Sequence, residues 1–311
     1  MKNIYISAPF YGYGNHILKQ SGHNIIYGPK DLKSSIKDYH AIITYVSDKI
    51  SESLLDEATK LKVVSNYAVG VDNIDLLACK KRGIKVGNTP DVLTFATAEL
   101  ALTLILNCGR QIKEATSDVQ KGLWKKWRPQ GYLGPGLQNS TVGIIGMGRI
   151  GQCLGKMLSH GFGVNVIYYS RKDKNLSYAK YVELDELLST SDYISLHMAS
   201  NEQTQSFFNL EKFKKMKSTA YFINTARGDL VNEDELIMAL DKGNMAGAGL
   251  DVTDPEPPKE NAAIIRHPKV FLLPHIGSAT LKAREEMGII AAKNVLMALD
   301  DKPLVHEVID A

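Results

Sequence analysis

Short apolar runs alternate with longer segments in which apolar residues recur at helical spacing. In the first part of the chain, strand-like runs occur at 3–7, 24–28, 41–46, 62–68 and 83–88. Segments such as "SESLLDEATK" (51–60) and "IDLLACKKRG" (74–83) lie between some of these runs and are polar segments of helical period. Regular alternation of buried strands with helices is typical of a parallel sheet. The pattern therefore predicts an α/β fold for this part of the chain.

A second α/β series begins at Thr141. Its strand candidates are "TVGIIGMG", "VNVIYYS", "YISLHMA", "TAYFINTA", "AGAGLDV" and "KVFLLPHI", with helices between several of them. One of these helices has well-marked ends, because Asn232 and Glu235 have the spacing of a capping pair and Gly243 follows the apolar stripe of "ELIMALDK". The second series therefore also predicts an open α/β sheet.

Three further segments connect or complete the two series. We expect one long helix over roughly 94–121, followed by an irregular segment rich in Gly, Pro and aromatic residues at 121–140. A last amphipathic helix, at about 279–299, is expected to return to the first series. The second series would then be the middle of the chain.

Composition excludes several classes of protein. The 311 residues suit two domains, and 44% hydrophobic residues is ordinary for a soluble globular chain. A net charge of +3 is too small for broad nucleic-acid binding, so we interpret the basic clusters at 125–128 and 211–217 as solvated surface. The N-terminal residues lack a signal-peptide core, and no apolar stretch approaches a membrane span. Cys79, Cys108 and Cys153 form no metal or disulfide pattern, which favours a cytoplasmic location and no bound metal.

The segment "VGIIGMGRIGQCLGKML" (142–158) contains Gly146, Gly148 and Gly151 in G-x-G-x-x-G spacing, between an apolar strand and an amphipathic helix. The first glycine permits a tight turn, the second lets the backbone approach a pyrophosphate, and the third allows close packing of helix on strand. The helix N-terminus presents N–H groups to the anion. In this strand–turn–helix setting, we predict a dinucleotide-binding loop.

The residues after the second strand of this unit indicate which dinucleotide is bound. An acid at position 170 would bind the ribose hydroxyls of NAD, but the chain has Ser170, Arg171 and Lys172 there. A hydroxyl and two cations can hold a 2′-phosphate, and Arg can do so through two hydrogen bonds. The alternative is a solvent-facing basic turn. We expect NADP(H) to be preferred, with NAD(H) possible.

Three polar stretches follow strands of the second series: "NTARGDL" (224–230), "LDVTDPEPP" (250–258) and "LLPHIGSAT" (272–280). The carboxyl ends of strands in a doubly wound sheet converge on the ligand crevice. Arg227, Asp251, Glu256 and His275 are therefore expected to meet at one site. Each of them alone also has an ordinary interpretation as a surface or loop residue.

Together these motifs resemble the D-isomer-specific 2-hydroxyacid dehydrogenase family, and within it the glyoxylate/hydroxypyruvate reductases, over almost the full length. "NYAVGVDNID" (66–75) and "VGNTPDVLTFATAELALTLIL" (86–106) complete the likeness. The resemblance implies a Rossmann-type doubly wound cofactor domain at 97–280 and a flavodoxin-like substrate (catalytic) domain formed by 1–96 and 281–311. It also implies a homodimer, which we expect to involve the cofactor domain and the arm around 124–132.

The resemblance also assigns roles to individual residues. Arg227 matches the substrate anchor, Glu256 the partner of the histidine, and His275 the acid/base, so a small 2-keto acid would be reduced to the D-2-hydroxy acid. Ala68, Val69 and Gly70 match the loop whose backbone N–H groups hold the substrate carboxylate. The remaining matches are cofactor contacts, with His197 interpreted as a cofactor neighbour and not as a second acid: Thr97, Arg149, Ile150, His197, Thr204, Thr225, Ala226, Asp251 and Gly277.

Alternative functions stay open at this point. Formate dehydrogenases usually carry Gln in place of the acid that pairs with the histidine, so Glu256 argues against them. A phosphoglycerate dehydrogenase, or another D-2-hydroxyacid dehydrogenase using NAD, is a closer alternative, although the chain has no room for the extra regulatory domain that phosphoglycerate dehydrogenases often carry. A nucleotide-sensing protein similar to the transcriptional corepressors of the family could retain all three catalytic residues.

Overall fold

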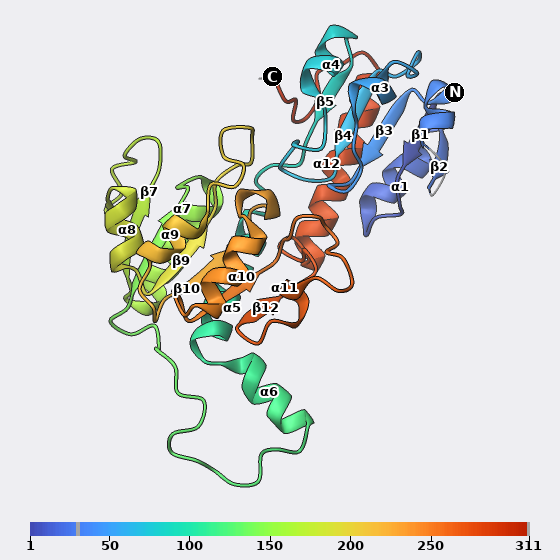
Figure 1. The fold of residues 1–311 in the computed structure, drawn as a ribbon. Helices are drawn as coiled ribbons and strands as arrows, with labels where there is room; N and C mark the ends of the chain where they lie inside the picture. Colours follow the sequence, from blue (N-terminus) through green and yellow to red (C-terminus); the bar gives the residue numbers. More distant parts are fainter. Residues whose placement is uncertain (29–31, 310–311) are drawn as a thin grey trace. The chain divides into compact units, whose positions relative to one another are not determined.

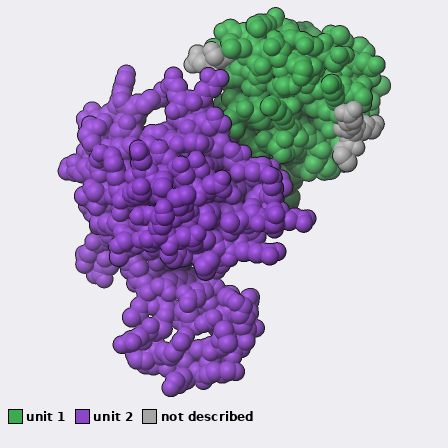
Figure 2. Space-filling view, viewed as in Figure 1, with its two compact units in different colours: residues 1–93, 278–311 green, residues 94–277 purple. Residues whose placement is uncertain are grey.

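The computed structural model describes residues 1–28 and 32–309. These residues form two compact units, shown in different colours in Figure 2. Unit 1 comprises 1–93 and 278–311, and unit 2 comprises 94–277. Unit 2 is therefore one continuous stretch of chain, whereas unit 1 is assembled from both ends.

Unit 1 contains a five-stranded parallel sheet in the order β2-β1-β3-β4-β5. The strands are β1 (Asn3–Ile6), β2 (Asn24–Tyr27), β3 (Ala41–Thr44), β4 (Val63–Asn66) and β5 (Lys85–Gly87). This order is that of flavodoxin-like sheets, as the sequence predicted. All residues of β3 and β4 are buried, as expected for strands covered on both faces.

Helices cover both faces of this sheet (Figure 1). One face packs against α1 (Tyr13–Gln20) and α12 (Leu281–Leu299), which cross closely at two glycines: a Cβ on Gly14 would lie 2.3 Å from the carbonyl oxygen of Gly288. The other elements of the unit are α2 (Leu32–Ser35), η1 (Ile36–Asp38), α3 (Glu52–Leu55) and α4 (Leu76–Lys81). Apolar residues of η1, α3 and α4 form a second core with β1, β3, β4 and β5.

Unit 2 contains a seven-stranded parallel sheet in the order β12-β11-β10-β9-β6-β7-β8. Its strands are β6 (Thr141–Ile145), β7 (Asn165–Tyr169), β8 (Lys180–Tyr181), β9 (Tyr193–Leu196), β10 (Tyr221–Asn224), β11 (Gly247–Leu250) and β12 (Val270–Leu272). Reading outward from β6, the chain runs to β7 and β8 on one side and to β9 through β12 on the other. The direction of winding therefore reverses at β6, which is the topological switch point where a doubly wound sheet binds ligands.

The sheet of unit 2 is also covered on both faces. Ile144 and Ile223 belong to the core formed with α5 (Thr94–Gly109) and α7 (Arg149–Lys156). Their neighbours Ile145 and Phe222 belong to the core on the opposite face. That core includes residues of α8 (Leu184–Thr190), α9 (Leu210–Lys215), α10 (Glu233–Asp241) and α11 (Ala263–Arg266). The π-helix η2 (Met157–Gly161) continues α7, and η3 (Gly228–Leu230) follows β10.

The single helix predicted over 94–121 is wrong, because the structure has two helices there. α5 ends at Gly109, α6 (Ile112–Gln120) begins after Gln111, and Gln111 has a left-handed backbone with φ 51°. Gly109 is tightly enclosed, since a Cβ on it would lie 2.2 Å from the hydroxyl of Tyr193. Residues 121–140 contain no helix or strand, as predicted, and with α6 they extend away from the body of unit 2 (Figure 1). The two-residue strand β8 was not predicted from the sequence.

The capping pair of α10 is only half as predicted. Asn232 caps the helix by accepting a hydrogen bond from the backbone N–H of Glu235 at 3.2 Å. The carboxylate of Glu235 instead accepts from the backbone N–H of Leu210 at 2.6 Å, so it serves the first turn of α9. Within 1–28 and 32–309, no helix is both long enough and apolar enough to cross a membrane.

Candidate active site

The glycine loop between β6 and α7 has the shape that a dinucleotide requires. Gly146 has φ 96°, and a Cβ on it would lie 2.6 Å from the carbonyl carbon of His197. A Cβ on Gly151 would lie 2.4 Å from the carbonyl oxygen of Gly146, so both positions are enclosed by the protein itself. A Cβ on Gly148 would meet nothing within 4 Å, and no side chain caps α7 at this residue. The open position therefore leaves the first N–H groups of α7 accessible to a phosphate.

Thr225 provides a second sign that unit 2 accommodates a ligand. Its hydroxyl follows β10 and is buried, and it has no hydrogen-bond partner among the described residues. A buried hydroxyl without a partner is uncommon, because burial removes it from water without compensation. Thr225 is one of the predicted cofactor contacts, and a hydroxyl that a bound dinucleotide could pair with is consistent with that prediction.

The other predicted cofactor contacts in unit 2 fall into two groups. Thr97, Asp251 and Gly277 lie together, since a Cβ on Gly277 would approach Asp251 Oδ2 at 3.2 Å and Thr97 Cγ2 at 3.5 Å. Arg149 and Ile150 form the first turn of α7. Thr204 is different, because its hydroxyl is engaged within its own loop, where it accepts from Asn201 N at 2.8 Å. The structure therefore gives Thr204 a local role, while the first two groups border the carboxyl edge of the sheet and the glycine loop.

The basic residues after β7 are placed as the sequence predicted, with one difference. Ser170 directly follows β7, and Arg171 and Lys172 are exposed. Neither cation has an acidic partner within 4 Å among the described residues. The hydroxyl of Ser170 donates to the backbone oxygen of Lys172 at 2.7 Å, so this hydroxyl proton is not available to donate to a phosphate. The cations are therefore the donors that remain for a phosphate at this turn.

His197 is held as a neutral side chain at the end of β9. Its Nε2 lies 2.8 Å from the hydroxyl of Ser195, a partner that the sequence motifs did not indicate. Desolvation of the imidazole lowers the pKa of His197 from 6.5 to about 4. A histidine with this pKa is uncharged near neutral pH, which is consistent with a cofactor neighbour and argues against an acid.

Asp251 joins the ends of three neighbouring strands. Its backbone N–H donates to the carbonyl of Asn224, the last residue of β10, and its carbonyl accepts from His275 N after β12, both at 2.9 Å. Its carboxylate accepts from the backbone N–H groups of Ile276 and Gly277, each at 2.7 Å. Burial raises the pKa of Asp251, although both backbone hydrogen bonds and the nearby His275 oppose this rise. The residue therefore sets the position of the loop that contains His275.

His275 and Glu256 form the predicted acid/base pair. Nδ1 of His275 lies 2.5 Å from Oε1 of Glu256. Both side chains remain partly accessible, with 25% of the histidine and 35% of the glutamate side chain exposed. Because the carboxylate engages Nδ1, the other ring nitrogen, Nε2, is the one available to a substrate.

Arg227 lies on the turn directly after β10, in the same unit as the pair. The side chain of Asn224 shapes this turn by accepting from Ala226 N at 2.9 Å and donating to the carbonyl of Arg227 at 2.7 Å. One guanidinium nitrogen donates to the carbonyl of Ala226 at 2.8 Å. The next residue, Gly228, fits directly against the backbone of Thr253, where a Cβ would lie only 2.0 Å from the carbonyl carbon. Asn224 and Gly228 therefore position Arg227, which motif spacing alone did not indicate.

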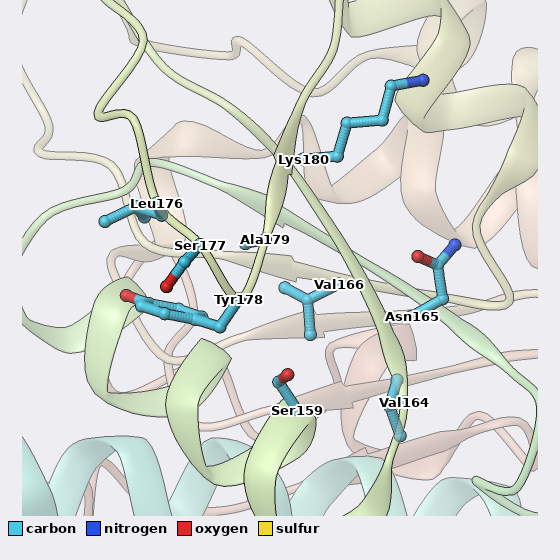
Figure 3. Close-up of a pocket in the computed structure, with 9 residues that line it drawn as sticks. All are labelled: Ser159, Val164, Asn165, Val166, Leu176, Ser177, Tyr178, Ala179 and Lys180. Atoms are coloured by element: carbon cyan, nitrogen blue, oxygen red, sulfur yellow. The ribbon is translucent and has the colours of Figure 1, made fainter.

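The remaining predicted contacts, Ala68, Val69 and Gly70, belong to unit 1, where they directly follow β4. The hollow in Figure 3 is a separate feature of unit 2, with a volume of about 530 Å³. It lies at the amino end of β7, next to Asn165 and Val166, and includes none of the predicted site residues. No cluster of potential metal ligands was found in the described part of the chain.

Comparison with known proteins agrees with this arrangement. The family model of the D-isomer specific 2-hydroxyacid dehydrogenase NAD binding domain matches residues 102–277. The glyoxylate reductase of Thermococcus litoralis is 46% identical over 273 residues, which cover 85% of this chain and 82% of that relative.

Two solved structures are similar over nearly the whole chain. The TT0316 protein of Thermus thermophilus has a TM-score of 0.93 and 38% identity, covering 99% of this chain and 100% of that one. An NADPH-dependent glyoxylate/hydroxypyruvate reductase from Sinorhizobium meliloti, in complex with NADP and malonate, has a TM-score of 0.87 and 28% identity, covering 99% and 97%. Because the family model spans more than half of the chain and the archaeal relative is this similar, the chain belongs to the D-isomer-specific 2-hydroxyacid dehydrogenase family.

Proposed function

We propose that the protein reduces glyoxylate, hydroxypyruvate or a similarly small 2-keto acid to the D-2-hydroxy acid, with NADPH as the preferred cofactor. The coarser statement, an NAD(P)-dependent oxidoreductase that reduces a small keto acid, follows from the family and from glyoxylate reductase relatives. The observation that supports the proposal most directly is the His275–Glu256 pair, because it provides a proton donor with a fixed orientation.

The chemistry divides between the cofactor and three side chains. A bound nicotinamide supplies the hydride that reaches the carbonyl carbon. His275 gives the proton from Nε2 to the carbonyl oxygen, while Glu256 accepts from Nδ1 and fixes the orientation of the ring. Arg227 binds the carboxylate and the carbonyl oxygen, and it stabilises the negative charge that develops on that oxygen.

The preference for NADPH rests on the turn after β7. Arg171 and Lys172 are exposed cations without acidic partners among the described residues, and no carboxylate occupies position 170 to repel a 2′-phosphate. The Sinorhizobium meliloti relative is named as NADPH-dependent. The alternative is an NAD-using member of the family in which these cations are only part of the surface.

Two further assignments belong to the proposal. We infer that residues 97–280 bind the cofactor and that 1–96 with 281–311 bind the substrate side, where Ala68, Val69 and Gly70 hold the carboxylate. We also infer a cytoplasmic homodimer: Cys79, Cys108 and Cys153 are free thiols, and unit 2 extends an arm with exposed aromatic side chains.

The cofactor assignment is tested by comparing kcat/KM for NADPH and NADH in the wild type, Arg171→Ala and Ser170→Asp. Loss of one charge-assisted contact to phosphate should raise KM for NADPH roughly 10- to 100-fold and leave that for NADH nearly unchanged. Ser170→Asp should reduce use of NADPH further, because it adds repulsion and offers the ribose hydroxyls a partner. A wild type that favours NADH, or an Arg171→Ala variant that loses both cofactors equally, would refute the assignment.

The reaction itself is tested by absorbance at 340 nm with NADPH and a panel of glyoxylate, hydroxypyruvate, pyruvate and branched 2-keto acids. His275→Ala should lower the rate by roughly 10²- to 10⁴-fold while cofactor affinity stays within a few-fold. Tight cofactor binding without turnover of any 2-keto acid would instead favour a nucleotide-sensing protein.

A further inference from the structure

In the loop after β4, the backbone carbonyl oxygens of Ala68, Val69 and Gly70 each accept a hydrogen bond from another part of unit 1. The carbonyl of Ala68 accepts from the backbone N–H of Thr89 at 2.8 Å. The carbonyl of Val69 accepts from Nδ2 of Asn88 at 2.8 Å, and that of Gly70 from Nδ2 of Asn66 at 2.7 Å. This arrangement fixes the direction of three peptide groups in a row.

Fixing a carbonyl also fixes the N–H of the following residue, because a trans peptide is planar and its C=O and N–H point in opposite directions. The three anchors therefore orient the N–H groups of Val69, Gly70 and Val71 away from their donors. None of these three N–H groups has an acceptor among the described residues. Successive unpaired backbone N–H groups form a concave site for an anion.

The two asparagines are themselves held in place, Asn66 through its side chain and Asn88 through its backbone. Oδ1 of Asn66 accepts from the hydroxyl of Thr44 at 3.0 Å, and its Nδ2 also reaches Oδ1 of Asn73 at 3.0 Å. Asn66 is fully buried. The backbone carbonyl of Asn88 accepts from Nδ2 of Asn294 on α12 at 3.2 Å, so this residue is anchored independently of its side chain. The Asn66 amide and the backbone of Asn88 are therefore fixed before any ligand arrives, which reduces the entropy lost on binding.

We infer that Asn88 and Asn66 are positioning residues that hold the backbone N–H groups of Val69, Gly70 and Val71 ready for the carboxylate of the 2-keto acid. This inference rests on the proposed function for the identity of the anion. Neither asparagine needs to touch the substrate. Without the Asn88 amide, the peptide between Val69 and Gly70 can rotate and present its carbonyl oxygen, which repels a carboxylate.

Asn88→Asp and Asn88→Ala test this role. Asp keeps the size of the side chain but removes the donor, and both variants retain the backbone bond to Asn294. The matched control is Asn3→Ala, because Asn3 also donates from Nδ2 to a backbone carbonyl of unit 1, that of Asp38 at 3.0 Å, at the start of β1. Each protein is measured for kcat and KM with glyoxylate, for NADPH affinity by fluorescence titration, and for Tm.

In both Asn88 variants, KM for glyoxylate should rise about 10-fold, equal to about 1.4 kcal/mol, while kcat stays within about 3-fold. NADPH affinity should be unchanged, and Asn3→Ala should match the wild type in every kinetic constant. An unchanged KM in a folded Asn88 variant overturns the inference. A variant in which kcat falls, KM rises and NADPH affinity falls to a similar extent also overturns it.

A separate measurement distinguishes this inference from the proposed function. Calorimetric titration of the NADPH complex with oxalate, a non-reducible anion, reports on the N–H groups without turnover. If the wild type reduces no 2-keto acid, the proposed function fails. Weaker oxalate binding in Asn88→Asp than in the wild type would still support the anion site. Equal oxalate binding in the two proteins overturns the inference about Asn88.

Discussion

His275 is held from two directions. Its backbone N–H is bonded to Asp251, and its imidazole is bonded to Glu256. The residue also has a left-handed backbone with φ 53°, which is uncommon for a residue with a side chain. Such conformations persist only where surrounding bonds impose them, and they occur preferentially at functional sites. Asp251 therefore fixes the backbone of His275, and Glu256 fixes the orientation of its ring.

Replacement of Glu256 with Gln should reveal how far the carboxylate orients the ring of His275. Gln keeps the size of the side chain and one oxygen that can accept a hydrogen bond from Nδ1, but the bond loses the strength that the negative charge gives it. The ring should be held less firmly, so kcat/KM for the keto acid should fall, although by less than in His275→Ala. The measurement is kcat/KM for glyoxylate in both variants, and a Glu256→Gln variant as active as the wild type would show that the two residues are not coupled.

His197 should make the protein sensitive to acid. Its pKa in the folded protein, about 4, is below the unfolded value of 6.5, so the unfolded state binds more protons between these values. The stability contributed by the neutral ring is complete above pH 6.5 and is lost as the pH falls toward 4. At pH 5 this loss is about 2 kcal/mol.

Urea unfolding of the wild type and His197→Gln at pH 8 and pH 5 checks this expectation. The variant should lose less free energy of unfolding between the two conditions, by about 2 kcal/mol. The exposed His16→Gln on α1 controls for the removal of one imidazole. Identical losses in the wild type and His197→Gln would contradict the assignment.

At this scale the sequence predicted candidate site residues but not the contacts that hold them. Arg227, Glu256 and His275 were predicted because polar residues that follow strands of a doubly wound sheet share one edge, and their roles came from the family resemblance. Asn224 and Ser195 were not identifiable, because each acts through a contact between side chain and local backbone that no spacing rule expresses. The engagement of the Ser170 hydroxyl with its own turn was missed for the same reason.

The loops after β10 and β11 interlock at Gly228. No side chain fits there, because the backbone of Thr253 occupies the position of a Cβ. The turn that contains Arg227 is thereby fixed against the loop that leads to Glu256. This contact explains how Arg227 and Glu256, two predicted catalytic residues far apart in the chain, keep a defined relation within unit 2.

Gly228→Ala should therefore destabilise the protein by about 1–3 kcal/mol, the usual range for overpacking, and should lower kcat by displacing Arg227. Thermal unfolding and glyoxylate kinetics measure the two effects. Gly161→Ala in η2 is the matched control, because a Cβ there would meet nothing within 4 Å. Equal Tm and kcat in Gly228→Ala and the wild type would show that the loops are free to move apart.

Periodicity predicted most helices and strands, but it could not predict where the helical segment 94–121 breaks. Gly109 is a possible local stop, but a single glycine inside a helical pattern is also tolerated, and apolar residues resume at Ile112, so the pattern alone does not predict a break. The break comes from tertiary packing, since Gly109 is enclosed by Tyr193 and by the distant Gly134, whose Cβ would lie 2.1 Å from the carbonyl of Gly109. The short strand β8 escaped prediction because two residues do not establish a period.

At the scale of the whole molecule, α6 and residues 121–133 form an arm with exposed apolar side chains. Trp124 and Trp127 are 60% and 78% exposed, and Val119, Leu123 and Leu133 are also exposed. An apolar surface of this kind is typical of a subunit interface. The arm is the basis of the proposed homodimer.

Sedimentation equilibrium at micromolar concentration should give about twice the chain mass of 34.3 kDa. Trp127→Ser should weaken the dimer at least about 10-fold, since buried tryptophans often contribute 2 kcal/mol or more to an interface. Phe162→Ser is the control, because Phe162 is an exposed aromatic residue of unit 2 outside the arm. A wild-type mass of 34.3 kDa would refute the dimer.

The chain leaves unit 1 at Leu93 and returns to it only at Ser278, which has a consequence for biosynthesis. Unit 2 is complete on the ribosome once residue 277 has emerged, so it can fold while the final segment is still being made. Unit 1 still lacks α12 at that moment, so the face of its sheet that packs against α1 and α12 is incompletely covered. The part that is synthesised first is therefore expected to mature last. Residues 94–277 expressed alone should fold and bind NADPH, whereas residues 1–93 alone should expose apolar surface and aggregate. A stably folded fragment of residues 1–93 would contradict this order of folding.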